Sequence, residues 1–178
     1  MLDNYLRRTE CRQCGSKDLS LAIQLSPTPL ANAYLKTKDL ESQEKTYPLD
    51  VFFCNECKHV QLLDVVNPKI LFENYVYVSG TSPIFVEHFL NYAGFLNKNY
   101  CKEGLVIDIG SNDGTLLKCF KKYGYSVLGI EPADKIAKQS ISDGIETIID
   151  FFNPELAELI RKRQGLAKII TANNVFAH

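Results

Sequence analysis

The chain has 178 residues, 46% of them hydrophobic, and its 20 basic and 21 acidic residues leave a net charge of −1. This size suits one moderate hydrophobic core plus a small additional lobe. The chain contains no run of 20 apolar residues and no basic stripe, so we expect a soluble protein whose partners are neither membranes nor nucleic acids. No apolar signal segment opens the sequence, which favours a reducing cytoplasm.

The first third of the chain contains two pairs of cysteines with the spacing C-x-x-C: Cys11 with Cys14, and Cys54 with Cys57. Four thiolates in two tight pairs match tetrahedral zinc, and a long interval between the pairs allows an insertion. Because four cysteines leave no coordination position open, such a zinc ion would be structural. A redox pair and simple buried cysteines remain as alternatives. The second pair lies between strand-like runs at 48–53 and 59–63, so we expect it at the tip of a hairpin.

A segment rich in tyrosine and small residues, Tyr-Val-Tyr-Val-Ser-Gly-Thr-Ser, occupies residues 75–82. Pro83 then begins an amphipathic helical pattern that we expect to bridge two lobes. Tyr75 and Tyr77 are either aromatic core residues of a strand or contacts to a substrate, and the pattern leaves both readings open. We therefore expect a zinc-binding lobe at 1–82, a bridging helix at 83–100 and a nucleotide-binding part at 101–178.

The nucleotide-binding part opens with an apolar β-branched run at 105–109, followed by the turn Gly110–Gly114 and a helical pattern over 115–123. A second strand at 125–130 ends at Glu131-Pro132, about twenty residues after the first glycine. That is the spacing at which a second strand delivers an acid to ribose hydroxyls. A carboxylate suits this task because it accepts hydrogen bonds from both hydroxyls of a cis-diol.

The pattern then repeats along the chain. We expect a helix at 135–143, a strand at 145–149, a helix that begins after Asn153 and a strand at 168–172. In the second of these helices the residues expected to face inward are Leu156, Leu159 and Ile160. Four strands with three intervening helices predict a parallel, doubly wound, Rossmann-like sheet, whose ligands bind outside the carboxyl ends of the strands.

The turn reads D-x-G-x-x-x-G from Asp108 to Gly114, whereas a dinucleotide fingerprint reads G-x-G-x-x-G. With an acid after the second strand and Asp150-Phe151 after the third, it resembles class I S-adenosylmethionine-dependent methyltransferases. The resemblance implies that Glu131 binds the ribose, Asp150 the adenine amino group and Phe151 the adenine face. The cofactor-binding residues that it implies are Asp108, Gly110, Ser111, Asn112, Gly114, Glu131, Pro132, Asp150, Phe151 and Asn173.

Several motifs in one order sharpen the resemblance. They are the first cysteine pair, Pro-Thr-Pro-Leu-Ala-Asn-Ala-Tyr at 27–34, Tyr-Pro-Leu at 47–49 with the second cysteine pair, and the segment 75–82. The chain is similar over its whole length to the sugar C-methyltransferase family. That family combines an amino-terminal zinc domain, a central S-adenosylmethionine domain and a carboxyl-terminal domain, and it methylates a carbon of a nucleotide-linked keto-deoxysugar.

The resemblance implies Zn²⁺ and S-adenosylmethionine as cofactors, and it makes Tyr75, Tyr77 and His178 candidate catalytic residues. It also leads us to expect that the chain stops partway through the family's fold, lacks the base and most of the sugar pocket, and is inactive alone. A non-catalytic zinc-containing module that binds a nucleotide or cofactor is the alternative. The fourth strand, at 168–172, would then be an uncovered sheet edge through which the chain could dimerise.

Overall fold

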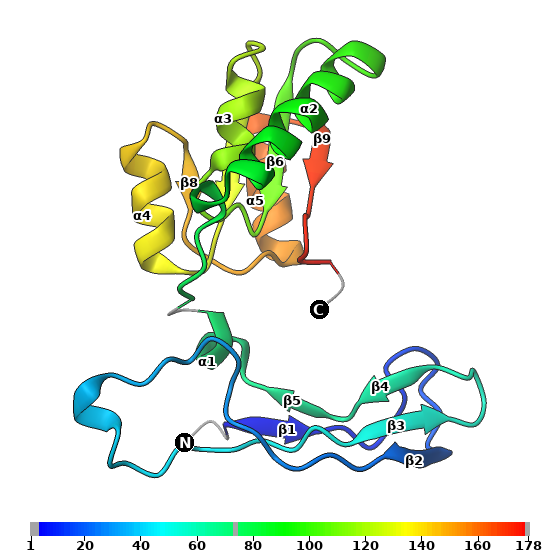
Figure 1. Ribbon diagram of the computed structural model, residues 1–178. Coiled ribbons are helices and arrows are strands. Elements are labelled where there is room, and N and C mark those ends of the chain that lie inside the picture. The colour runs from blue at the N-terminus through cyan, green and yellow to red at the C-terminus, as the bar shows by residue number, and fades with distance from the viewer. Residues whose placement is uncertain (1–3, 73–74, 177–178) are drawn as a thin grey trace. The chain divides into compact units, whose positions relative to one another are not determined.

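The computed structural model describes residues 4–72 and 75–176 and divides the chain into two compact units, 1–72 and 73–178 (Figure 1). The division falls at Phe72, before the tyrosine-containing segment, whereas the sequence suggested a boundary after Ser82. Residues 75–82 and the helix that follows them therefore belong to the second unit. Each unit is described by itself.

The first unit consists of short antiparallel strands. One sheet has the order β2-β3-β4, formed by Leu19–Ile23, Val51–Cys54 and Val60–Leu62. A second pair joins β1 at Tyr5–Arg7 to β5 at Asp64–Val66. A 3-10 helix η1 at Thr37–Asp39 and a short helix α1 at Pro68–Phe72 complete the unit. The second cysteine pair lies at the β3–β4 hairpin, as predicted.

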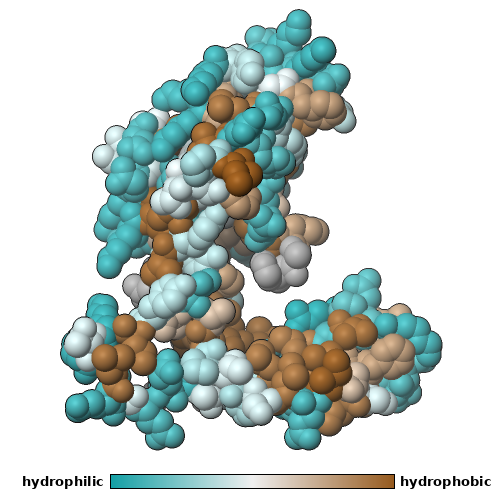
Figure 2. Space-filling model, viewed as in Figure 1, coloured by the Kyte–Doolittle hydropathy of each residue, from teal (hydrophilic) through white to brown (hydrophobic). Residues whose placement is uncertain are grey.

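The hydrophobic core of the first unit is small. Among residues 4–72, the buried hydrophobic side chains are Cys11, Tyr47, Cys54 and Leu63. Hydrophobic residues also gather at its surface (Figure 2), where Leu6, Ile23 and Val60 are exposed. An ion pair of 2.9 Å between Arg7 Nη1 and Asp64 Oδ2 joins β1 to β5. Burial of so little apolar surface points to an additional source of stability for this unit.

The second unit contains a four-stranded parallel sheet with the order β8-β7-β6-β9. Its strands are β6 at Leu105–Ile109, β7 at Ser126–Ile130, β8 at Thr147–Ile148 and β9 at Ala167–Thr171. Its helices are η2 at Ser79–Thr81, α2 at Pro83–Asn99, α3 at Thr115–Lys121, α4 at Asp134–Ser142 and α5 at Pro154–Gln164. The expected mixed α/β fold with a parallel sheet is confirmed.

Separate hydrophobic clusters cover the two faces of this sheet. On one face, Phe89 and Ala93 of α2 pack with Leu117 and Phe120 of α3 against Val106. On the other face, α5 packs on the sheet through the second cluster, whose members are Leu105, Ile107, Leu128, Ile130, Leu156 and Ile160. This alternation of buried faces along β6 is what a doubly wound sheet requires.

Two details differ from the sequence-based expectation. Leu159 was expected to face inward but is 42% exposed, because the buried stripe of α5 is restricted to Leu156 and Ile160, one turn apart. Strand β8 has two residues instead of the five expected at 145–149, and the Asp150 N–H turns back to donate to Ile148 O. The predicted cap of α5 is correct, since Asn153 Oδ1 accepts from the Leu156 N–H at 2.8 Å.

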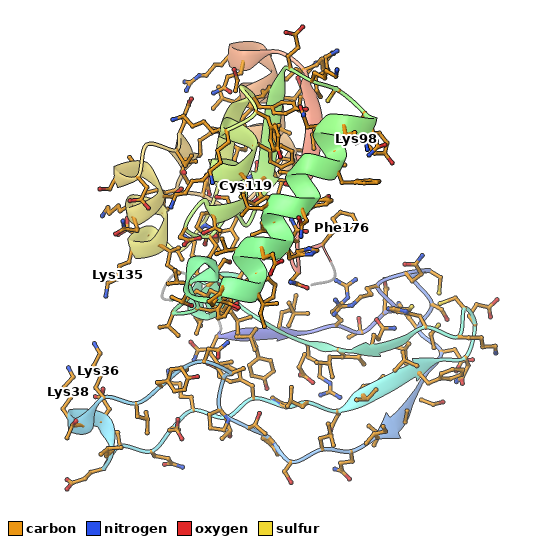
Figure 3. All side chains as sticks on the ribbon, turned by 45° about the horizontal axis from the view of Figure 1, so that its top comes forward. Lys36, Lys38, Lys98, Cys119, Lys135 and Phe176 are labelled. Carbon is orange, nitrogen blue, oxygen red and sulfur yellow. The ribbon has the colours of Figure 1, made fainter. Side chains whose placement is uncertain are left out.

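Within the described residues, none of the helices combines the length and the apolar character needed to cross a membrane. Lysine side chains are spread over separate elements, with Lys38 in η1, Lys98 in α2 and Lys135 in α4 (Figure 3). Cys119, in contrast, is buried on α3, where its thiol donates to Thr115 O.

Candidate functional site

The four cysteines of the two C-x-x-C pairs come together in the first unit. Their sulfur atoms all lie within 4.8 Å of one another, and Cys11 to Cys57 and Cys14 to Cys54 are 3.6 Å apart. Tetrahedral zinc with sulfurs at about 2.3 Å places them about 3.8 Å from each other, so the cluster fits zinc. Cys11 and Cys54 are buried, whereas Cys14 and Cys57 are exposed.

The two pairs adopt the same backbone turn. In the first, the Cys11 N–H donates to Ser16 O and the Gly15 N–H donates to Cys11 O. In the second, Cys54 makes the equivalent bonds with His59 and Lys58. Gly15 and Lys58 both have positive φ, 75° and 65°. The Gln13 N–H also points at Cys11 Sγ, at 3.4 Å, as a donor to a thiolate should.

Gln61 lies behind this cluster. Its side chain is buried, and its Oε1 accepts from the Arg12 N–H at 3.0 Å. Its Nε2 makes no hydrogen bond of ordinary geometry among the described residues but lies near enough to the Cys11 sulfur to favour the ionised thiol. The pKa of Cys11 is lowered to about 6: burial opposes the ionisation of this thiol, but N–H donors, including the Gln61 side chain, outweigh it. We infer that the Gln61 amide supports a metal-bound Cys11 thiolate.

Replacement of Gln61 is therefore expected to weaken zinc binding. Gln61→Leu removes a donor to the thiolate, and Gln61→Glu places a carboxylate beside four thiolates. Loss of such outer contacts typically lowers metal affinity about 10- to 100-fold, and the glutamate variant should be the weaker of the two. Competition with a chromophoric chelator measures this affinity. Equal zinc affinity in all three proteins would contradict the assignment.

The residues assigned to a cofactor lie along one edge of the parallel sheet. Because β8, β7, β6 and β9 run in the same direction, their carboxyl ends meet at this edge and present Asp150, Glu131, Gly110 and Asn173 in that order. Residues that are far apart in the sequence are thus neighbours here, which is the arrangement expected for a ligand site.

Glu131 links the second strand to the turn after the first. Its Oε2 accepts from the Asn112 N–H at 2.9 Å, and its Oε1 accepts from the Ala133 N–H at 2.8 Å. The side chain is buried, and this burial raises its pKa although both N–H donors favour the charged form. Each carboxylate oxygen retains a lone pair, so Glu131 can still accept from a diol.

Asp108 is a second buried carboxyl, beneath the glycine turn. Its Oδ1 accepts from Thr171 Oγ1 of β9 at 2.6 Å, a contact between β6 and β9 that the sequence pattern did not reveal. Burial, together with repulsion from Glu131, raises its pKa to about 7, against the opposing effect of the Thr171 hydroxyl. Asp108 therefore supports the turn from inside the sheet.

Stability should depend on pH through Asp108. The unfolded carboxyl ionises near pH 4 while the folded one holds its proton to about pH 7, so its contribution is full below pH 4 and is lost as pH rises through about 7. Asp108→Asn should remove this contribution and raise the free energy of unfolding at pH 8 by as much as ~4 kcal/mol relative to wild type. Urea unfolding from pH 4 to 8 measures it. Parallel pH profiles for the two proteins would refute the expectation.

The segment after β9 closes over the glycine turn. Gly110 has φ 67°, and a Cβ atom there would lie 2.5 Å from Val175 Cγ2, so this position requires glycine. Asn173 is half-buried, and its Nδ2 is buried without a hydrogen-bond partner among the described residues. An unpaired buried donor at the carboxyl edge is what a polar ligand would satisfy.

The remaining assigned residues have different environments. The Ser111 side chain points at Gly129 in β7, where an added Cβ would lie 2.4 Å from its Oγ. Gly114 packs against Ser140 and Ile145, so its role in the structure is close packing. Pro132 is half-buried next to Glu131, Asp150 is exposed, and Phe151 is half-buried.

The candidate catalytic residues are placed only in part. Tyr77 is 41% exposed and Tyr75 is half-buried, both in the segment before η2. This segment is not a strand, so the reading of the two tyrosines as strand core residues is not supported. His178 lies outside the described residues.

The sequence did not reveal how this segment is held. Asn112 Oδ1 accepts from the Ser79 N–H at 2.8 Å, and Asp113 Oδ2 accepts from the Gly80 N–H at 3.1 Å. The small residues Ser79 and Gly80 beside two tyrosines were the available signal, because a glycine permits close approach of another group.

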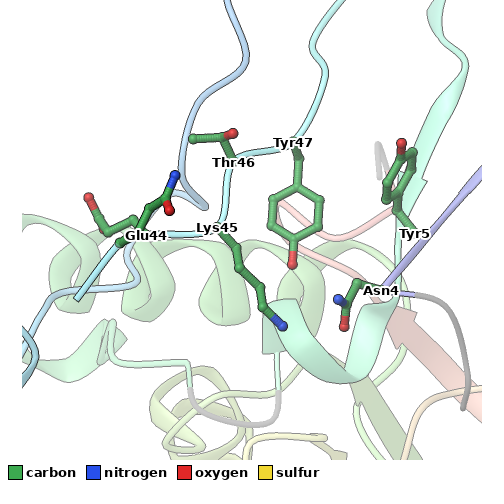
Figure 4. Close-up of a pocket in the computed structure, with 7 residues that line it drawn as sticks. Asn4, Tyr5, Glu44, Lys45, Thr46 and Tyr47 are labelled. Atoms are coloured by element: carbon green, nitrogen blue, oxygen red, sulfur yellow. The ribbon is translucent and has the colours of Figure 1, made fainter.

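A hollow also lies in the first unit (Figure 4), lined by Asn4, Tyr5, Gln43, Glu44, Lys45, Thr46 and Tyr47. The rings of Tyr5 and Tyr47 meet edge to face, with their centres 6.0 Å apart. No residue assigned from the sequence lines it.

Comparison with known proteins bears on both units of the chain. Residues 11–72, which include all four cysteines, match a family described as a putative zinc binding domain. The chain is 34% identical over 171 residues to the C-methyltransferase NovU of Streptomyces niveus, an alignment that covers 95% of this chain and 41% of that protein. The chain thus spans about two fifths of the length of this curated relative. The resemblance to a C-methyltransferase found in the sequence is confirmed over 95% of this chain, and residues 11–72 are similar to a zinc binding domain.

Proposed function

We propose that the second unit binds S-adenosylmethionine and that the chain acts in carbon methylation of a nucleotide-linked keto-deoxysugar. The observation that carries the proposal is the position of Glu131, a carboxylate at the end of β7 that is bonded to the turn after β6. This is where a doubly wound sheet places an acid for ribose hydroxyls. The similarity to a C-methyltransferase supports transfer of a methyl group to carbon.

The residues at the carboxyl edge fit such a cofactor. Glu131 would accept hydrogen bonds from the ribose diol, Asp150 would accept from the adenine amino group, and Phe151 would contact the adenine face. Asn173 Nδ2, which has no partner in the part of the chain that the structure describes, would donate to the bound molecule. The cofactor, when bound, supplies an electrophilic methyl group.

The substrate side would involve the tyrosines. Methylation of a ring carbon beside a ketone requires a base to remove a proton and donors to stabilise the carbonyl oxygen. A phenol can donate such a hydrogen bond, and the exposed Tyr77 is suited to do so. Tyr75 and His178 are proposed to border the same substrate.

Calorimetric titration of the zinc-loaded chain with S-adenosylhomocysteine tests the proposal. We expect binding to a single site and no binding of NAD, because the turn lacks the third glycine of a dinucleotide fingerprint. Absence of binding, or preference for NAD, would overturn it. Transfer of labelled methyl to a keto-deoxysugar nucleotide is measured separately. We expect none from the 178 residues alone, and turnover would contradict that part.

We also propose that the chain forms a dimer through β9. This strand is at one end of the sheet among the described residues, and Ile170 on it is 62% exposed. Unpaired strand edges recruit other strands. Light scattering should show a concentration-dependent dimer that Ile170→Lys abolishes. A strictly monomeric wild-type chain at high concentration would disprove this.

A further inference from the structure

A strap, defined here as residues 75–82, is fixed to the turn after β6 by side chains of that turn. Asn112 Nδ2 donates to Tyr77 O at 2.9 Å, and Asn112 Oδ1 accepts from the Ser79 N–H at 2.8 Å. One amide group thus binds the strap backbone on both sides of Val78. The carbonyl of the candidate substrate-binding tyrosine is itself one of the bonded groups.

The same residue also contacts the proposed ribose ligand. The main-chain N–H of Asn112 donates to Glu131 Oε2, and the residue adopts φ 52°, a left-handed conformation that asparagine tolerates better than most residues. Its main chain therefore faces the cofactor edge while its side chain faces the strap. The Asn112 side chain is nearly inaccessible, with 8% of the residue surface exposed.

Asp113 adds a further bond between the turn and the strap, and it explains why residue 80 is a glycine. Asp113 Oδ2 accepts from the Gly80 N–H, while its Oδ1 is held by Thr115 Oγ1 at 2.7 Å. A Cβ atom on Gly80 would lie 2.4 Å from Asp113 Oδ2. Because Asp113 is buried and held by Thr115, it cannot move aside cheaply, so residue 80 must lack a side chain.

We propose that Asn112 is a positioning residue that couples the cofactor site to the strap, so that a ligand on Glu131 also holds the segment that carries Tyr77. The inference rests on the proposed cofactor site, and it gives Asn112 a positioning role that is separate from the chemistry of methyl transfer. Asn112 fixes the backbone at Tyr77, and the exposed phenol remains available to a substrate. A ligand that holds Glu131 in place restricts the motion of Asn112, which is bonded to it, and hence the motion of the strap.

Hydrogen exchange of the strap, followed by mass spectrometry with and without S-adenosylhomocysteine, tests this coupling. Asn112→Gly keeps the left-handed backbone and the N–H bond to Glu131 but removes the amide, and Gly80→Ala disrupts the contact from the strap side. Asn32→Gly, the same replacement at a left-handed asparagine of the first unit, is the matched control.

In the ligand-free chain, Asn112→Gly and Gly80→Ala should both exchange the amide hydrogens of residues 78–82 at least about 10-fold faster than wild type and the control. The reason is that each variant loses bonds that protect the strap. In wild type, S-adenosylhomocysteine should slow this exchange about 3-fold or more. In Asn112→Gly, measured at a ligand concentration that fills the site, S-adenosylhomocysteine should leave the strap unprotected, a result that a merely structural role would not produce.

The outcomes separate this inference from the proposed function. Failure of wild type to bind S-adenosylhomocysteine would end the proposed function and the coupling with it. Binding without slower strap exchange would overturn the coupling alone, as would unaltered strap exchange in ligand-free Asn112→Gly. If Asn112→Gly also loses protection from hydrogen exchange in β6, its fold is disturbed, and Asn112→Asp is tested in its place. This variant keeps the acceptor for Ser79 and loses the donor to Tyr77, so unchanged strap exchange in it would equally overturn the inference.

Discussion

Removal of zinc is expected to unfold the first unit, residues 4–72, and to leave the second unit folded. The four cysteine sulfurs lie within 4.8 Å of one another, while the rest of this unit buries few hydrophobic side chains. Binding of structural zinc contributes about 10–16 kcal/mol in small domains, more than such a core can replace. The second unit has its own hydrophobic clusters on both sheet faces.

Elemental analysis should find one zinc ion per chain, and NMR spectra recorded during chelation should lose only the dispersed signals of the first unit. Cys54→Ser should have the same effect as the chelator, because Cys54 is fully buried in the cluster. Cys101→Ser is the control, since Cys101 lies in the second unit outside the cluster. A metal-free chain with an intact first unit would refute this expectation.

Replacement of Glu131 by alanine is expected to weaken binding of S-adenosylhomocysteine by about 2–4 kcal/mol, or roughly 30- to 1000-fold. The change removes the charged acceptor for a ribose diol. It also releases the Asn112 and Ala133 N–H groups that the carboxylate holds. Glu131→Gln keeps an oxygen acceptor without the charge and should fall between alanine and wild type.

Calorimetry measures these affinities, with Glu103→Ala as the control at an exposed glutamate. A folding measurement on each variant separates lost affinity from lost structure, because Glu131 also stabilises the turn. Equal affinity in folded Glu131→Ala would show that the ribose is bound elsewhere.

Local patterns predicted much of this molecule. The C-x-x-C pairs were legible because each turn forms within a few residues. The parallel sheet followed from the alternation of apolar runs with helical repeats, since parallel neighbours need crossover helices. The cap at Asn153 followed from an asparagine before a proline, and the position of Glu131 after the second strand followed from spacing. The sequence predicted that Leu159 faces inward because Leu156, Leu159 and Ile160 form one apolar pattern. Only the packing of α5 on the sheet determines which of them are buried.

Other features depend on contacts between distant residues, which no local pattern encodes. The bond from Thr171 to Asp108 spans 63 positions, and the bond from Ser79 to Asn112 spans 33. Gly129 of β7 drew no prediction from the sequence, yet the Ser111 side chain occupies the place of its missing Cβ. The contacts that support the candidate site were therefore harder to predict than the strands and turns that form it.

The matching turns of the two cysteine pairs bear on how freely the chain between them can vary. Each turn closes through its own backbone bonds, so the metal ion joins two turns that each form within a few residues of the sequence. The connection between β2 and β3, residues 24–50, then acts as a loop whose ends are tied. Loop-closure entropy grows slowly with length, and each doubling costs only about 0.6 kcal/mol. Insertions in this connection should therefore be tolerated far better than any change of spacing within a pair.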